Sequence, residues 1–188
     1  MFALVRKHFA KHITPRFVDI WVLSHLALSI ASVIFVTYVP VAWLCYLVAA
    51  YGTARVFEIV IYQANVLLFD EYRPNVIDYK LQSYRRMIIM LLQNYAEIIF
   101  WLATTYVMMS DDIGHIWMED ANPAFRSIYS SFITMTTFGN FNLEPKTHFG
   151  AFVILFHSTA GLFMTLLSLA RFVSLLPNPK SMDPREDR

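Results

Sequence analysis

Four long apolar runs separated by polar segments dominate the pattern of this sequence. They cover approximately residues 17–39, 41–68, 87–109 and 149–176. Each run is long enough to cross a bilayer as one helix, since about 20 apolar residues suffice. Gly and Pro are scarce inside the runs, which favours continuous helices. Pro40 leaves almost no loop between the first two runs, so the pattern predicts a tight helical hairpin over residues 17–68.

A polar stretch between the third and fourth runs breaks this pattern. The segment 129–145 is dense in Ser, Thr and Gly. Irregular backbone at membrane depth survives only inside protein or along a water-filled path. Asn122-Pro123 is typical of a helix N-cap followed by the first helical position. We therefore expect a short re-entrant helix over 123–136, followed by extended chain that lines a hydrated path.

The end of this short helix is a predicted cation site. The C-terminal end of a helix dipole is negative and would point toward the membrane centre. Hydroxyls and backbone carbonyls follow directly, and such oxygens can replace the water around K⁺ or Na⁺. The residues predicted to coordinate the ion are Thr136, Thr137, Phe138, Gly139 and Asn140.

Composition narrows the class of protein. The chain has 188 residues, is 57% hydrophobic and only 15% charged, and has a net charge of +1. These values predict a one-domain, all-α membrane protein and no nucleic-acid partner. HExxH, CxxC, Walker and GxSxG motifs are absent from the sequence, so we expect no enzymatic activity and no cofactor besides permeant K⁺ or Na⁺.

The distribution of Lys and Arg predicts the orientation in the membrane. Basic residues gather in the N-terminal segment, in the loop between the second and third runs, and in the tail. The opposite side carries only Arg126 and Lys146. The positive-inside rule therefore places both termini in the cytoplasm. We further expect the membrane to be a plasma membrane of bacterial type. The predicted cytoplasmic parts are residues 1–16, 69–86 and 177–188.

Residues 134–145 resemble the pore signature of the tetrameric potassium-channel superfamily, T-x-T-T-V-G-Y-G-D-x-x-P. Here they read Thr134-Met135-Thr136-Thr137-Phe138-Gly139-Asn140-Phe141-Asn142-Leu143-Glu144-Pro145. Pro145, Gly150 and Gly161 also repeat the spacing P-x4-G-x10-G of its two-helix members.

The resemblance covers residues 87–176 and implies a pore domain. Its parts would be an outer helix 87–109, a pore helix 123–136, a selectivity-filter loop 136–141 and an inner helix 149–176. It further implies a homotetramer in the lipid bilayer that conducts K⁺ passively, or monovalent cations without selectivity.

The filter Thr137-Phe138-Gly139-Asn140-Phe141 departs from the family pattern. Asn140 replaces the tyrosine and Phe141 replaces the second glycine. A left-handed backbone costs a non-Gly residue about 1–2 kcal/mol, so the outer filter should differ from the family's. We expect only the inner sites to survive below a wider mouth, with weaker discrimination between K⁺ and Na⁺. The mouth would be formed by Phe141, Asn142 and Glu144.

The fourth run contains candidate cavity, hinge and sensor residues. Residues at i, i+3, i+4 and i+7 share one helix face. That spacing predicts a cavity and an apolar constriction lined by Leu162, Thr165, Leu169, Phe172 and Val173. Gly161 is either a bending point or a site of close helix packing. His157 either bonds the back of the short helix or senses pH.

Three charged residues fall inside the apolar runs. Arg55 and Glu58 lie one turn apart in the second run, and Glu97 lies at equal depth in the third. Charges at mid-bilayer are seldom left unpaired, so we predict a cluster. The cluster could hold the hairpin to the third run, or it could take part in gating or proton sensing.

Two other functions remain open at this stage. A structural or regulatory subunit could keep the pore fold without conducting, as Phe141 would favour. A proton-coupled carrier could use Arg55, Glu58 and Glu97. We expect no regulatory domain within the chain, so a regulatory protein partner also remains open.

Overall fold

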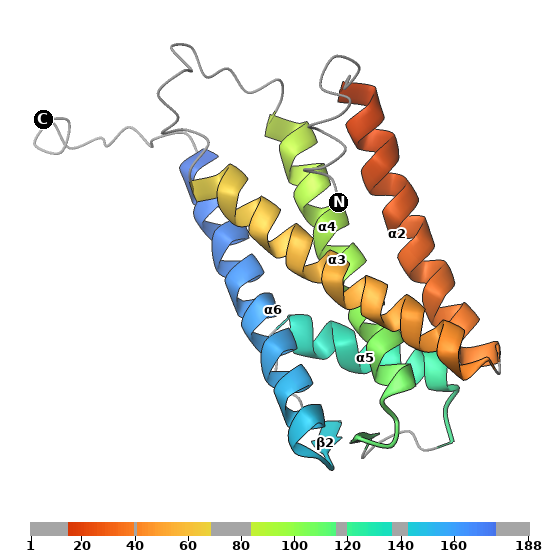
Figure 1. Cartoon of the computed structure of the whole chain (residues 1–188). Helices are drawn as coiled ribbons and strands as arrows, with labels where there is room; N and C mark the ends of the chain where they lie inside the picture. The colour runs from red at the N-terminus through yellow and green to blue at the C-terminus, as the bar shows by residue number, and fades with distance from the viewer. Residues whose placement is uncertain (1–14, 40, 69–83, 116–119, 137–142, 176–188) are drawn as a thin grey trace, which may run out of the picture.

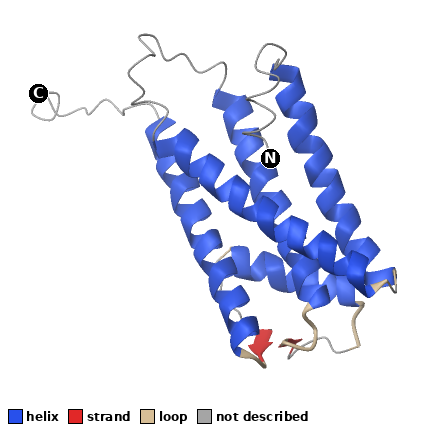
Figure 2. Cartoon of the chain, in the orientation of Figure 1, coloured by secondary structure: helices blue, strands red, loops and turns tan. Residues whose placement is uncertain are grey.

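The computed structural model describes residues 15–39, 41–68, 84–115, 120–136 and 143–175. Five helices and two short strands make up this part of the chain (Figures 1 and 2). In order they are α2 (Pro15–Tyr38), α3 (Ala42–Leu68), α4 (Tyr84–Met108), β1 (Ile113–His115), α5 (Pro123–Met135), β2 (Leu143–Pro145) and α6 (His148–Leu175). The protein is therefore all-α apart from one two-stranded ribbon.

Four of these helices, namely α2, α3, α4 and α6, are long and apolar enough to cross a membrane. This confirms the prediction of four spanning helices. Their ends differ from the predicted runs by at most three residues. The largest difference is at the start of α4, which begins at Tyr84 and therefore includes Arg86. This guanidinium pairs with Asp19 of α2 at 2.8 Å, which holds the polar first turn of α4 against α2.

Helix α4 lies at the centre of the packing. α2, α3 and α5 each pack extensively on it, whereas α2 and α3 contact each other much less. Side chains of α4 accordingly form most of the core, with Ile98, Trp101 and Tyr106 almost fully buried. Because α2 and α3 pack on α4 rather than on each other, they diverge from their shared turn (Figure 1).

The ribbon closes the chain segment that contains α5. β1 and β2 pair antiparallel, with Gly114 opposite Glu144, at the end of the bundle opposite to the start of α2 and the end of α6 (Figure 1). The Thr147 hydroxyl accepts a hydrogen bond from the Gly150 N–H at 3.0 Å and so caps the first turn of α6. The chain segment that contains α5 therefore begins and ends at this ribbon.

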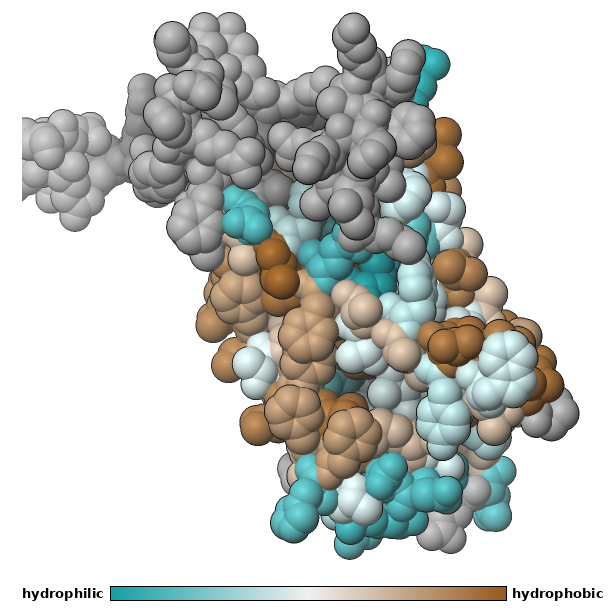
Figure 3. Space-filling view, viewed as in Figure 1, coloured by the Kyte–Doolittle hydropathy of each residue, from teal (hydrophilic) through white to brown (hydrophobic). Residues whose placement is uncertain are grey.

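The flank of the bundle is apolar and the ribbon end is polar. Large apolar side chains such as Ile20, Leu47, Leu155 and Leu166 are more than half exposed. Figure 3 shows hydrophobic residues over the flank and hydrophilic residues gathered at the ribbon end. An apolar surface of this extent suits a hydrocarbon surrounding, and the polar end suits contact with water.

Candidate functional site

Helix α5 begins where the sequence predicted. The Asn122 side-chain oxygen accepts a hydrogen bond from the Ala124 N–H at 2.9 Å, and Pro123 opens the helix. The helix ends at Met135, where Thr136 forms the C-cap. The Thr136 N–H and hydroxyl both donate to the Phe132 carbonyl, at 3.0 and 2.9 Å. This candidate ion ligand is thus held by the last turn of α5.

Helix α5 lies across the long helices, nearer to the ribbon than to the other end (Figure 1). Its polar face points into the protein: the buried side chains include Ser127, Ser130, Ser131 and Thr134. The Ser131 hydroxyl donates to the Ile99 carbonyl of α4 at 2.7 Å. These α5 hydroxyls thus contribute to packing, and the prediction that the chain after α5 lines a hydrated path falls mostly on residues outside the described ranges. Short side chains that bond backbone carbonyls allow close approach to α4.

The C-terminal end of α5 is fixed by α4 and α6. The Tyr95 hydroxyl donates to the Met135 carbonyl at 2.7 Å and lies 3.4 Å from the Thr165 hydroxyl. On the other side, a Cβ added at Gly161 would stand 2.8 Å from the same carbonyl oxygen. Gly161 therefore permits close packing, the second of the two roles that the sequence left open. Sequence reasoning missed Tyr95, although a tyrosine within an apolar run is a signal for a buried hydrogen bond.

Most of the predicted filter lies outside the described residues. The filter positions outside the described ranges are Thr137, Phe138, Gly139, Asn140 and Phe141, and the mouth residue Asn142 lies outside them too. Ion coordination by residues 137–140 and the wider mouth remain predictions. Of the predicted mouth residues, only Glu144 is described; it lies in β2 and is exposed to solvent.

His157 is fully buried, but it does not bond α5 as expected. Its Nδ1 lies 2.7 Å from the hydroxyl of Tyr106 on α4. Tyr106 in turn interacts with the side chain of Thr134 on α5. The predicted contact is therefore indirect, because the tyrosine of α4 stands between the histidine and the short helix. The other ring nitrogen, Nε2, has no partner among the described residues.

The predicted cavity residues of α6 do not share one environment. Leu162, Leu169, Phe172 and Val173 are exposed, and Leu166, which sequence reasoning missed, joins them. Thr165 is instead turned toward Tyr95 of α4. Thr165 is half-buried, and its place in a cavity stays a prediction. The other residues form an apolar stripe, here called the α6 stripe, made of Leu162, Leu166, Leu169, Phe172 and Val173.

The intramembrane charge cluster forms as predicted. Arg55 Nε donates to Glu97 Oε1 at 2.9 Å, and a terminal guanidinium nitrogen donates to Glu58 Oε2 at 2.8 Å. The Trp101 indole N–H also donates to Glu97 Oε1, at 3.2 Å. Glu97 is completely buried, and its other oxygen, Oε2, has no partner among the described residues. One guanidinium therefore pairs with two carboxylates and links α3 to α4.

A second histidine connects the ribbon to α5. His115 of β1 has its Nδ1 3.2 Å from the Ser130 hydroxyl. Burial, together with the positive charges of Arg126 and Lys146, lowers the pKa of His115 to about 4. The imidazole is therefore neutral at pH 7.

No group of three or more metal-ligating side chains occurs in the described part of the chain. Comparison with protein-family models, with curated proteins and with solved structures gave no match to this chain. The site must therefore be interpreted from its own geometry and from the motif in the sequence.

Proposed function

We propose that this chain is one subunit of a homotetrameric channel. The channel would conduct K⁺ passively across a membrane and would discriminate only weakly against other monovalent cations. The observation that carries the proposal is the placement of α5. It is a short, N-capped helix held across the bundle between α4 and α6, immediately before the threonines of the filter motif.

The course of the chain supports a re-entrant segment. The excursion begins and ends at the β1–β2 ribbon, and α5 lies within the length of the long helices (Figure 1). Its C-terminal carbonyls carry the negative end of the dipole, which favours a cation there. One chain supplies only one loop of oxygens, and rings of carbonyls in channels are built from several copies.

The α6 stripe supports a shared central axis. In a tetramer it would face the corresponding helices of three neighbours and line an inner cavity. Apolar constrictions can close a pore by dewetting, so the stripe would also supply the gate. Lipid is the alternative neighbour of these side chains in a single protomer.

Two other functions compete with conduction. A non-conducting subunit would keep this packing, and Phe141 in place of a filter glycine favours it. A proton-coupled carrier would use the charge cluster, where buried Glu97 Oε2 could accept a proton. The paired guanidinium favours a structural role for the cluster over a carrier, because a carrier must break those contacts in each cycle.

Flux into liposomes separates the three functions. Purified protein should relax a K⁺ gradient without moving protons, and bi-ionic reversal potentials should show only a modest preference for K⁺ over Na⁺. Proton movement coupled to K⁺ would indicate a carrier. Absence of both fluxes would indicate a structural subunit.

A matched pair of glycine variants ties the flux to the filter. Gly139→Ala should abolish K⁺ flux because the added side chain disfavours the filter backbone. Gly114→Ala should leave flux unchanged, since the one tight contact of its Cβ would be with the flexible side chain of Lys146. Light scattering should give the mass of four chains, and a monomer that conducts would contradict the proposal.

A further inference from the structure

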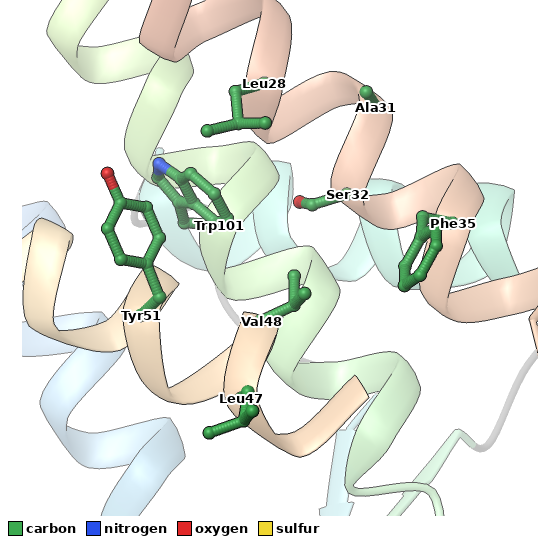
Figure 4. A pocket seen from close by; sticks show the side chains of 8 residues that line it. All are labelled: Leu28, Ala31, Ser32, Phe35, Leu47, Val48, Tyr51 and Trp101. Atoms are coloured by element: carbon green, nitrogen blue, oxygen red, sulfur yellow. The ribbon is translucent and has the colours of Figure 1, made fainter. Parts of the chain in front are cut away.

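A groove opens between the two helices of the N-terminal hairpin. Figure 4 shows it walled by α2 on one side and α3 on the other, with the indole of α4 at its base. The groove has a volume of about 390 Å³, which lies within the range of small-ligand sites. The residues that matter for the argument are Leu28, Ala31 and Phe35 of α2, Leu47 and Tyr51 of α3, and Trp101 of α4.

The groove exists because α2 and α3 pack on α4 rather than on each other. The two helices therefore diverge and leave an open wedge between them (Figure 1). Both helices are candidate membrane spans, so the wedge opens toward hydrocarbon. Leu28 and Leu47 at its rim are 49% and 58% exposed, so the groove is accessible from the side.

The polar atoms near the groove already have partners within the protein. The Ser32 hydroxyl lies 2.7 Å from the Thr104 hydroxyl and donates to the Ser29 carbonyl. The Tyr51 hydroxyl lies 3.1 Å from His25 Nε2. The lining thus offers an occupant almost only apolar surface. Water needs two or more polar partners to be stable in such a space, so it is a poor occupant.

We propose that the groove binds an acyl chain of a membrane lipid. Hydrocarbon is the medium on the open side, the lining is aliphatic and aromatic, and a flexible chain can enter laterally between the helices. The chain would rest on Trp101, whose ring packs edge-on to Tyr51 with centroids 5.4 Å apart. The same indole donates to Glu97, so Trp101 lies between the groove and the charge cluster. This proposal is independent of ion conduction.

Quenching of Trp101 fluorescence by brominated lipid tests the proposal. The parent for this experiment is the triple variant Trp21→Phe/Trp43→Phe/Trp117→Phe, in which Trp101 is the only tryptophan. In bilayers whose acyl chains carry bromine, Trp101 fluorescence should fall to well under half of its value in unbrominated lipid. Ala31→Phe, which fills the groove, should restore most of the lost fluorescence because the chain is displaced.

Ala50→Phe provides the matched control. Ala50 is exposed on α3 but does not line the groove, so its quenching should equal that of the parent. Circular dichroism checks that every variant keeps its helicity. Absent quenching in the parent, or equal quenching in both phenylalanine variants, would overturn the proposal. Quenching that disappears as the protein-to-lipid ratio rises would also overturn it, by showing that a second copy fills the groove.

Discussion

The hairpin region and the α4–α5–α6 region both bury polar groups, but they do so by different means. Between α3 and α4 one guanidinium pairs with two carboxylates inside the bundle. Between α4 and α5, neutral hydroxyls donate to backbone carbonyls, as Ser131 does to Ile99. A paired charge requires one specific partner, whereas a hydroxyl can use any nearby carbonyl.

This difference sets how each region should respond to change. The charge cluster fixes which faces of α3 and α4 meet, and loss of one member leaves a buried charge behind. The hydroxyl contacts are individually weaker, but they let α5 lie close to α4 and α6. We therefore expect substitutions in the hairpin to change mainly the stability of the protein. Substitutions around α5 should change mainly the K⁺ flux.

Loss of Arg55 should have the largest effect on stability. Arg55→Met leaves Glu97 buried without its main partner, which should cost about 3–5 kcal/mol. The double variant Arg55→Met/Glu97→Leu should recover most of that loss, because it removes both charges. Unfolding in mixed detergent micelles measures both. Equal stability of the single and double variants would show that the ion pair does not hold α3 to α4.

Two glycine substitutions compare the regions directly. An alanine Cβ at Gly161 would stand 2.8 Å from the Met135 carbonyl oxygen, so α5 and α6 must separate; Gly161→Ala should cost about 1–3 kcal/mol and sharply reduce K⁺ flux. Gly52→Ala meets the Trp101 ring instead and should lower stability while leaving flux nearly intact. Thermal unfolding and liposome flux are measured on both. Equal flux in the two variants would remove the distinction between the regions.

Loss of the Tyr95 hydroxyl should have a smaller effect. Tyr95→Phe removes the hydroxyl that donates to the Met135 carbonyl and should lower the free energy of unfolding by about 1–3 kcal/mol. The loss should lie near the lower end of this range because the carbonyl stays in the last turn of α5. Flux should fall with it, since the end of α5 loses its anchor. Tyr46→Phe is the matched control, because Tyr46 is 63% exposed on α3. Equal flux in the two variants would show that the anchor is dispensable.

The sequence predicted the fold and the charge cluster better than it predicted the environment of the hydroxyl groups. Spanning helices follow from apolar length, and Arg55 had few partners available at its depth. Ser131 and Thr165 could not be placed from the sequence, since a hydroxyl is compatible with water, backbone or a neighbouring side chain. Tyr106 lies between His157 and α5 because α4, α5 and α6 meet at that point, and this packing could not be predicted from the sequence.

Acidification tests the connection between the ribbon and α5, and its effect is confined to pH values below neutral. His115 has a pKa of about 4 in the folded protein, below its ordinary value of 6.5. Between these values the unfolded chain binds a proton that the native state excludes, so stability should fall as pH drops from 6.5 to 4. Above pH 6.5 both states are neutral at this residue and its contribution is constant. The melting temperature of His115→Gln should depend less on pH across that window than that of the unmodified protein. Identical pH profiles would show that protonation of the ribbon histidine is not opposed by its burial or by the charges of Arg126 and Lys146.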